Sequence, residues 1–173
     1  MRTAVIYKSK TGFTKKYAEW ISEELSADLF ELPKVSAGIL TDYDTVIFGG
    51  GLHAGGISGL KYITKNIGKL QGKKVIVFAT GASPAREEII TEIKNKNFTA
   101  GQQKQIQFFY LRGGFDYNKL KAVDKILMTL MKMQLKKKKE LTPDESGMLA
   151  AYDRPVNFTE KENINDLIIY VNS

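Results

Sequence analysis

The amino-acid sequence predicts an α/β fold in which helices cover both faces of a doubly wound, five-stranded parallel sheet. Two observations carry this prediction. Short, continuous apolar runs rich in Val, Ile and Phe alternate along the chain with segments whose apolar residues recur at helical spacing. No internal repeat or linker interrupts this alternation, so we expect a single domain over residues 1–173.

The candidate strands are the apolar runs, whose β-branched and aromatic residues suit a sheet that is buried on both faces. The first of them contains the uninterrupted run Thr3-Ala4-Val5-Ile6-Tyr7, and the second is the shortest. In chain order we predict strands at Arg2–Tyr7, Asp28–Leu32, Thr45–Gly49, Lys74–Thr80 and Gln105–Leu111.

The candidate helices lie between these strands and after the last one. In the first helix, apolar residues return every three or four positions, which places them on one face. These residues are Tyr17, Trp20, Ile21 and Leu25. We predict helices over Phe13–Leu25, from near Gly59 to Leu70, from about Ala85 to Asn95, and over Glu160–Val171.

The segment 116–158 lies between the fifth strand and the last helix and is longer than a direct crossover requires, so we expect an insertion. Apolar residues recur in it at helical spacing, and the basic run Lys136–Lys139 follows them. One interpretation is a helix packed on its own domain with a solvated lysine tail. The other is an interfacial helix whose apolar side enters a membrane while the lysines meet anionic lipid.

Composition narrows the classes of function. Hydrophobic residues make up 43% of the chain and charged residues 26%, as in globular proteins. Because the chain has no cysteine, disulfides, thiolate zinc sites, iron–sulfur clusters and cysteine nucleophiles are excluded. The formal charge of +7 favours acidic partners. Nucleic acid is disfavoured, since aromatic residues do not interleave with the lysines. No secretory leader or membrane-spanning run is evident, so we expect a cytoplasmic protein.

Ligands of open parallel sheets bind at the carboxyl ends of the strands, so the loops at those ends are the candidate sites. The first loop joins a strand to a helix N-terminus, where free N–H groups and the helix dipole favour an anion. It consists of Ser9, Lys10, Thr11, Gly12, Phe13 and Thr14. Its three hydroxyls and its glycine predict a phosphate site, although a simple helix cap would explain one hydroxyl.

The second candidate loop, Gly49–Ser58, is rich in glycine. The pattern Gly49-x-Gly51-x-x-Ala54 fits the loose dinucleotide fingerprint, but it follows the third strand and lacks the acidic residue expected further on, so we reject a nicotinamide cofactor. The glycines indicate either backbone lying against a flat ligand or a mobile surface loop. With a third loop, the remaining candidate residues are Gly50, Gly51, Leu52, His53, Ala54, Gly55, Thr80, Gly81, Ala82 and Ser83.

His53 is the only histidine in the chain. Serine-hydrolase triads and multi-histidine metal sites are therefore excluded, and we expect no metal site. A lone histidine has either a structural role or, in this loop, a role in contacting the ligand. No catalytic residue can be assigned from the pattern of residues.

The run Ser9-Lys10-Thr11-Gly12-Phe13-Thr14 resembles the [ST]-x-T-G-x-T phosphate loop of flavodoxins, at the same place after the first strand. The resemblance implies a flavodoxin-like strand order 2-1-3-4-5 and an FMN cofactor with its phosphate in this loop. The second and third loops would then flank the isoalloxazine ring. Two features differ from the flavodoxin pattern: these loops contain no Phe, Tyr or Trp, and the chain is basic.

A narrower resemblance concerns the insertion. Leu111-Arg112-Gly113-Gly114-Phe115-Asp116-Tyr117, leading into 124–133, resembles the insertion of menaquinone-dependent protoporphyrinogen dehydrogenases. It implies an FMN-dependent oxidoreductase that oxidises protoporphyrinogen or a similar hydrophobic substrate, with a quinone as acceptor and peripheral contact with the inner face of the cell membrane. His53 stands where that family commonly has arginine, and Ala54 where it has an aromatic residue.

Two alternatives to this enzyme remain open. One is a flavodoxin-type electron carrier without a substrate of its own. The other is a non-redox module that binds a phosphate ligand, since the fold alone does not determine function. In the enzyme, Arg112 could bind a substrate carboxylate in a bidentate pair, or it could form a structural ion pair.

Overall fold

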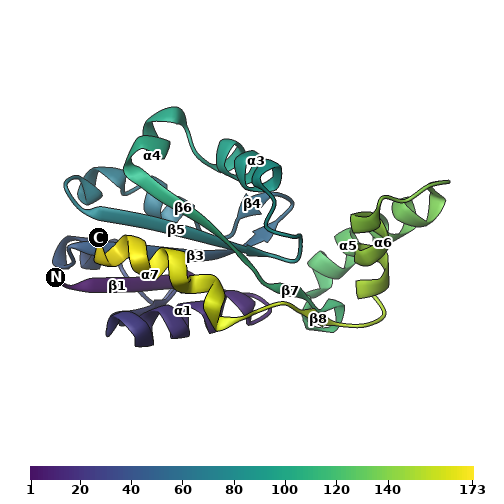
Figure 1. The fold of residues 1–173 in the computed structure, drawn as a ribbon, viewed down its shortest axis with the longest axis horizontal. Coiled ribbons are helices and arrows are strands. Elements are labelled where there is room, and N and C mark those ends of the chain that lie inside the picture. Colours follow the sequence, from purple (N-terminus) through teal and green to yellow (C-terminus); the bar gives the residue numbers. More distant parts are fainter.

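The computed structural model describes all residues, 1–173. Five strands form a parallel sheet in the order β2-β1-β3-β5-β6, which confirms the predicted order. The strands are β1 Thr3–Lys8, β2 Asp28–Glu31, β3 Thr45–His53, β5 Lys74–Gly81 and β6 Ile106–Arg112. Figure 1 shows the helices on both sides of this sheet.

Helices α1 (Phe13–Leu25) and α7 (Asn165–Asn172) cover one face of the sheet. The other face is covered by α2 (Lys61–Thr64), α3 (Glu87–Asn97) and the 3-10 helices η1 (Ala37–Asp42) and η2 (Ile67–Leu70). The remaining short helices of the body are α4 (Ala100–Gln105) and the 3-10 turn η4 (Lys161–Ile164), which precedes α7. The α4 helix was not predicted from the sequence.

The core follows from the alternation of side chains along the central strands. In β3, Val46 and Phe48 pack toward α2 and α3, whereas Ile47 packs toward α1 and α7. All three side chains are fully buried. Because both faces of each strand are buried, the strands appear in the sequence as continuous apolar runs and not as an alternation of apolar and polar residues.

The predicted helix from Gly59 to Leu70 is wrong as a single element, because it is divided into α2 and η2. The side-chain amide of Asn66 donates a hydrogen bond of 2.8 Å to the carbonyl oxygen of Tyr62. In a continuous α-helix that carbonyl would accept from the backbone N–H of residue 66. A local side-chain hydrogen bond of this kind competes with the helix, and α2 ends at Thr64.

The expectation that Gly49–Ser58 forms one loop is also wrong, because β3 continues to His53 and turns back into β4 (Gly56–Ile57). The two turn residues, Ala54 and Gly55, have positive φ angles of 49° and 77°, as in the type I′ turn of a tight β-hairpin. The first glycines of the run are therefore strand residues. A Cβ atom on Gly49 would overlap the buried ring of Phe78.

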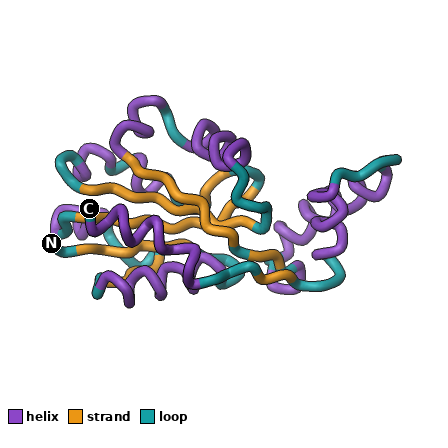
Figure 2. The backbone as a smooth tube through the Cα atoms, viewed as in Figure 1, coloured by secondary structure: helices purple, strands orange, loops and turns teal.

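The segment 116–158 projects past the carboxyl ends of the strands, as Figures 1 and 2 show. Its base is a two-stranded antiparallel pair, β7 (Gly114–Phe115) and β8 (Val156–Asn157). Between these strands lie the 3-10 turn η3 (Tyr117–Lys119), α5 (Ala122–Lys137) and α6 (Pro143–Ala151). We call α5 and α6 the inserted helix pair. No helix of the chain has both the length and the apolar composition needed to span a membrane.

We predict that Gly49→Ala lowers the free energy of unfolding by about 1–3 kcal/mol, because the added methyl group must displace Phe78 in a packed core. Urea denaturation measures this change. Gly68→Ala is the matched control, since nothing lies within 4 Å of its Cβ position, and its effect should stay within about 0.5 kcal/mol. Equal effects of the two variants would contradict the packing argument.

Candidate functional site

Three segments meet at the carboxyl edge of the sheet because the strands are paired in a parallel register. Gly51 of β3 lies opposite Thr80 of β5, and Gly81 lies opposite Arg112 of β6. The hydroxyl groups of Thr14, in the first turn of α1, and Thr80 form a buried hydrogen bond of 2.7 Å. A Cβ atom on Gly51 would lie 3.4 Å from the Thr14 Oγ1 atom. The register therefore brings together residues from all three candidate loops.

The first loop has the geometry of an anion site. Gly12 adopts a φ of 97°, and its N–H donates a hydrogen bond of 3.1 Å to Ser9 Oγ. No side chain caps α1, so the N–H groups of its first turn remain available at the positive end of the helix dipole. Nothing lies within 4 Å of the position that a Gly12 Cβ would take. An anion can therefore approach this backbone closely.

The hydroxyl groups of this loop have different roles. Thr14 is buried and bonded to Thr80, so it holds the first loop against the third. Ser9 accepts the Gly12 N–H and shapes the turn. The hydroxyl group of Thr11 makes no hydrogen bond within the protein and is partly exposed. Among the three hydroxyls predicted to bind phosphate, Thr11 is the one whose side chain is not already engaged.

The second segment is a fixed hairpin and not a mobile loop. The ammonium group of Lys96 donates to the carbonyl oxygen of Ala54 at 3.0 Å. The side-chain amide of Asn97 donates to the carbonyl oxygen of Gly55 at 2.8 Å, and its oxygen accepts from the N–H of Ile57 at 2.9 Å. The end of α3 therefore holds the hairpin tip in place.

A side chain of the insertion joins the first two segments. Asp124, at the start of α5, accepts a hydrogen bond of 2.8 Å from Lys10 Nζ on one carboxylate oxygen. Its other oxygen lies 3.4 Å from Nε2 of His53. The Lys10 hydrogen bond, aided by the charges of Lys10, His53 and Lys121, lowers the pKa of Asp124 against the opposing effect of burial. Asp124 is therefore ionised at neutral pH.

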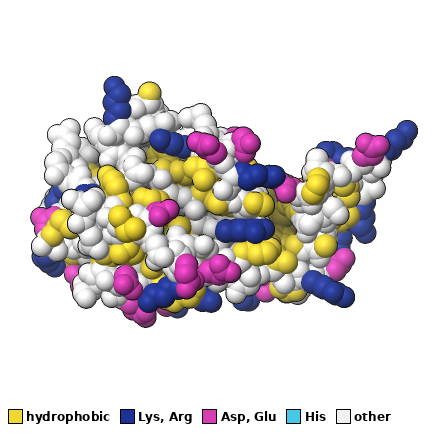
Figure 3. Space-filling model, viewed as in Figure 1, with side chains coloured by type: hydrophobic (Ala, Val, Ile, Leu, Met, Phe, Trp, Pro, Cys, Tyr) yellow, Lys and Arg dark blue, Asp and Glu magenta, His cyan; other side chains and the backbone are white.

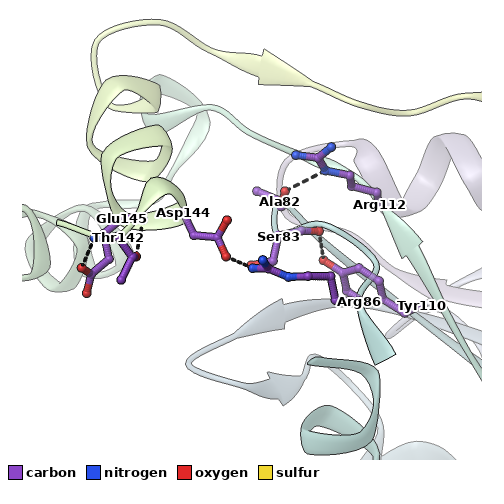
Figure 4. Close-up of polar contacts among 8 residues, drawn as sticks. All are labelled: Ala82, Ser83, Arg86, Tyr110, Arg112, Thr142, Asp144 and Glu145. Atoms are coloured by element: carbon purple, nitrogen blue, oxygen red, sulfur yellow. Dashed lines mark hydrogen bonds and ion pairs between the residues drawn. The ribbon is translucent and has the colours of Figure 1, made fainter. Parts of the chain in front are cut away.

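The third segment is held by side chains from β6 (Figure 4). The hydroxyl group of Tyr110 donates to the carbonyl oxygen of Ser83 at 2.8 Å, and the Nε of Arg112 donates to the carbonyl oxygen of Ala82 at 3.1 Å. Burial raises the pKa of Tyr110 to about 12, so it stays a neutral donor. Just beyond this segment, Arg86 forms an ion pair with Asp144 of α6.

Sequence reasoning did not identify Asp124, Arg86 or Asp144 as site residues. Each is a charged residue that no local pattern assigns to the site, and its partner lies 58 to 114 positions away in the chain. The predicted candidates do lie at one edge of the sheet, as the parallel register requires. Only the docking of the insertion brings these three charged residues to that edge.

These residues fit the phosphate and the ring of FMN. The start of α1 offers free N–H groups for a phosphate, and backbone at Gly51 and Gly81 lies at the same edge of the sheet, where a Gly81 Cβ would meet the side chains of Tyr110 and Leu52. No aromatic side chain from the second or third segment covers that backbone. Figure 3 shows a hollow between the body and the inserted helix pair, with hydrophobic side chains along it.

Comparison with known proteins agrees with this geometry. A family model described as "Flavodoxin domain" matches residues 4–142. An uncharacterized protein of Methanocaldococcus jannaschii is 33% identical over an alignment of 106 residues, and the match covers 57% of this chain and 69% of that protein.

Solved structures with a similar fold include two flavodoxins. One, from the domain Archaea, has a TM-score of 0.44 at 18% identity, covering 79% of this chain and 99% of that chain. The other, from Megasphaera elsdenii in the two-electron reduced state, has a TM-score of 0.47 at 16% identity, covering 62% of this chain and 84% of that chain.

We predict that Thr11→Val weakens FMN binding about tenfold and leaves riboflavin binding nearly unchanged, because the lost hydroxyl addresses the phosphate that riboflavin lacks. Fluorescence titration of the apoprotein with each flavin measures both dissociation constants. Thr41→Val is the matched control, since its hydroxyl bonds to Gly38 far from the loop. An equal loss for the two flavins would mean that the phosphate lies elsewhere.

Proposed function

This chain belongs to the flavodoxin domain family and binds FMN, and on that premise we propose that it is an FMN-dependent oxidoreductase acting on a hydrophobic substrate with a quinone as acceptor. A substrate of the protoporphyrinogen type is the specific candidate. The observation that carries the proposal is the inserted helix pair, which contacts the first two cofactor segments through Asp124 and the start of α3 through Asp144.

An electron carrier needs only an exposed flavin edge and a surface that complements its partners. The inserted helix pair instead extends the protein beyond the cofactor edge and leaves a hollow beside it, where Figure 3 shows both hydrophobic and basic side chains. Such a hollow suits an apolar molecule that carries anionic groups. This argument favours an enzyme over a carrier.

When bound, FMN supplies the two-electron acceptor for this reaction. In each turnover the substrate loses two electrons and two protons. A quinone then gains two electrons and two protons and becomes a quinol. The residues of the chain bind and orient these molecules. The N–H groups at the start of α1 and Thr11 bind the phosphate, and the hairpin fixed by Asn97 limits where the ring can lie.

Arg112 is the residue that we propose for orienting the substrate. Its Nε is bonded to Ala82, and its guanidinium lies 3.7 Å above the ring of Phe158. These two contacts hold the guanidinium in place, and no hydrogen bond or ion pair engages its terminal nitrogens; Figure 4 shows the bond to Ala82. A fixed guanidinium can form a bidentate pair with a substrate carboxylate.

One observation favours the rival function, a flavodoxin-type electron carrier. The raised pKa of Tyr110, about 12, keeps its phenol protonated, and Nε2 of His53 faces Asp124 at 3.4 Å, so Nδ1 of His53 is the imidazole atom left to exchange a proton. A carrier transfers electrons without a protein acid or base. An enzyme on this edge would rely on His53, solvent and the cofactor for the protons.

We predict that FMN-loaded protein oxidises protoporphyrinogen under anaerobic conditions and reduces a menaquinone analogue. We also predict that Arg112→Gln raises KM about tenfold with a smaller effect on kcat, because a bidentate contact to the substrate is lost. Arg154→Gln, an exposed arginine of the insertion, is the matched control and should change neither constant. A flavin that is reduced and reoxidised by redox partners without any turnover would identify the carrier instead.

We propose in addition that the inserted helix pair docks on an anionic membrane surface, where quinones reside. A stripe of large apolar side chains on α5 has no partner in the structure and is between 40% and 78% exposed: Val123, Ile126, Leu127, Leu130 and Met133. An exposed stripe of this size is uncommon on a protein without a partner for it. The lysines at 136–139 follow the stripe directly, so charge complementarity favours anionic lipid as the occupant.

We predict that the protein co-sediments with vesicles containing anionic phosphatidylserine and not with neutral vesicles. Lys138 is paired with Glu145 of α6, so the three other lysines of the run contribute about 1 kcal/mol each near such a surface at low salt, and added salt weakens the attraction. Changing Lys136, Lys137 and Lys139 to Gln, which leaves that ion pair intact, should abolish binding. Changing the exposed body lysines 61, 65 and 69 to Gln lowers the net charge by the same amount and should leave binding intact. Equal loss for both variants would show that only net charge matters.

A further inference from the structure

Asp124 is the only charged residue of the chain that is buried, with 5% of its surface exposed. The preceding residue on the same helix, Val123, is 78% exposed, so α5 is covered on the side of Asp124 and open to solvent on the side of Val123. A buried carboxylate is unfavourable unless cations and hydrogen bonds compensate it. Its location therefore depends on the groups that face it, which are Lys10, His53 and, through its charge, Lys121.

Two of these partners belong to the segments that hold FMN. Lys10 lies in the phosphate loop, between Ser9 and Thr11, and His53 ends β3 at the hairpin. In the structure the ammonium group of Lys10 is directed to Asp124, 2.8 Å away. The cation of the candidate phosphate loop is thus neutralised by a carboxylate from the insertion.

We propose that Asp124 is a positioning residue that couples FMN binding to the docking of the inserted helix pair by competing with the phosphate for Lys10. When the phosphate enters the loop, it and the carboxylate share one cation and repel each other. His53 then remains as the partner of Asp124, which keeps the carboxylate from being left unpaired. Phosphate binding therefore loosens the contact between α5 and the phosphate loop, and that contact in turn weakens phosphate binding.

This inference rests on the FMN site and not on the substrate proposed above. A protein that fails to oxidise protoporphyrinogen but binds FMN leaves it intact. It also differs from a purely structural role for Asp124. A structural role would affect FMN and riboflavin equally, because both flavins carry the same ring and only FMN carries the phosphate.

The test is a double-mutant cycle on the two flavins. Asp124→Asn should tighten FMN binding about three- to tenfold, because Lys10 is then no longer held by a carboxylate and is free to meet the phosphate, and should leave riboflavin unchanged. Lys10→Gln should weaken FMN binding. When Asp124→Asn is made in the Lys10→Gln variant, the change in the FMN dissociation constant should be at most half of the change that Asp124→Asn causes in the unmodified protein. An unchanged or lowered preference for FMN over riboflavin in Asp124→Asn would overturn the proposal.

Asp144→Asn is the matched control, because it breaks the other ion pair of the inserted helix pair, with Arg86, away from the phosphate loop. It should leave the ratio of the FMN and riboflavin dissociation constants unchanged. If it shifts this ratio as much as Asp124→Asn does, general loosening of the insertion is the cause and the proposal fails.

A second measurement uses the unmodified chain and does not depend on the folding of a variant. Inorganic phosphate should speed amide hydrogen exchange in residues 120–127, at the start of α5, compared with chloride at equal ionic strength. In Lys10→Gln, phosphate should have no such effect. Slower exchange, or no change, in the unmodified protein with phosphate bound would contradict the competition for Lys10.

Discussion

Parallel pairing places Lys8 of β1 opposite Gly50 of β3. It also places Gly51 of β3 opposite Thr80 of β5, so the three strands end together at one edge of the sheet. The rest of the site depends on this register. It sets the start of α1 against the third segment, where the hydroxyl groups of Thr14 and Thr80 form their buried hydrogen bond. A shift of one residue in any of the three strands would turn these side chains to the other face.

Close packing of backbone against side chains determines the surface that this edge offers to the flavin. Gly49 gives room to the ring of Phe78 inside the sheet, and Gly114 does the same for Phe13, whose ring would lie 2.7 Å from an added Cβ. Both glycines are therefore required by packing. The second and third segments contribute backbone and mostly small residues at this edge and contain no Phe, Tyr or Trp.

Charge, in contrast, determines where the insertion lies. The inserted helix pair has its own small core, in which Tyr152 packs against Phe115 and bonds to the carbonyl oxygen of Met128. It joins the body through the short β7–β8 pair and through ion pairs of Asp124 and Asp144. A lobe held by a few polar contacts can move relative to the cofactor edge more easily than one held by a large apolar interface. The same contacts connect the lobe to the Ser9–Thr14 loop and to the start of α3.

The sequence by itself determined the strands of the sheet and the start of α1. These features are local: continuous apolar runs mark buried strands, and a glycine with hydroxyl residues marks the start of α1. The strand order came from the resemblance of Ser9–Thr14 to the flavodoxin loop, because the pairing of strands is not a local feature of the chain. Only the tertiary structure decided that Gly49–Gly51 belong to a strand, since the reason is the ring of Phe78, a residue of another strand. It also decided the roles of Asp124, Arg86 and Asp144. Their partners lie far away in the chain, and a single charged residue carries no local pattern that would identify its partner.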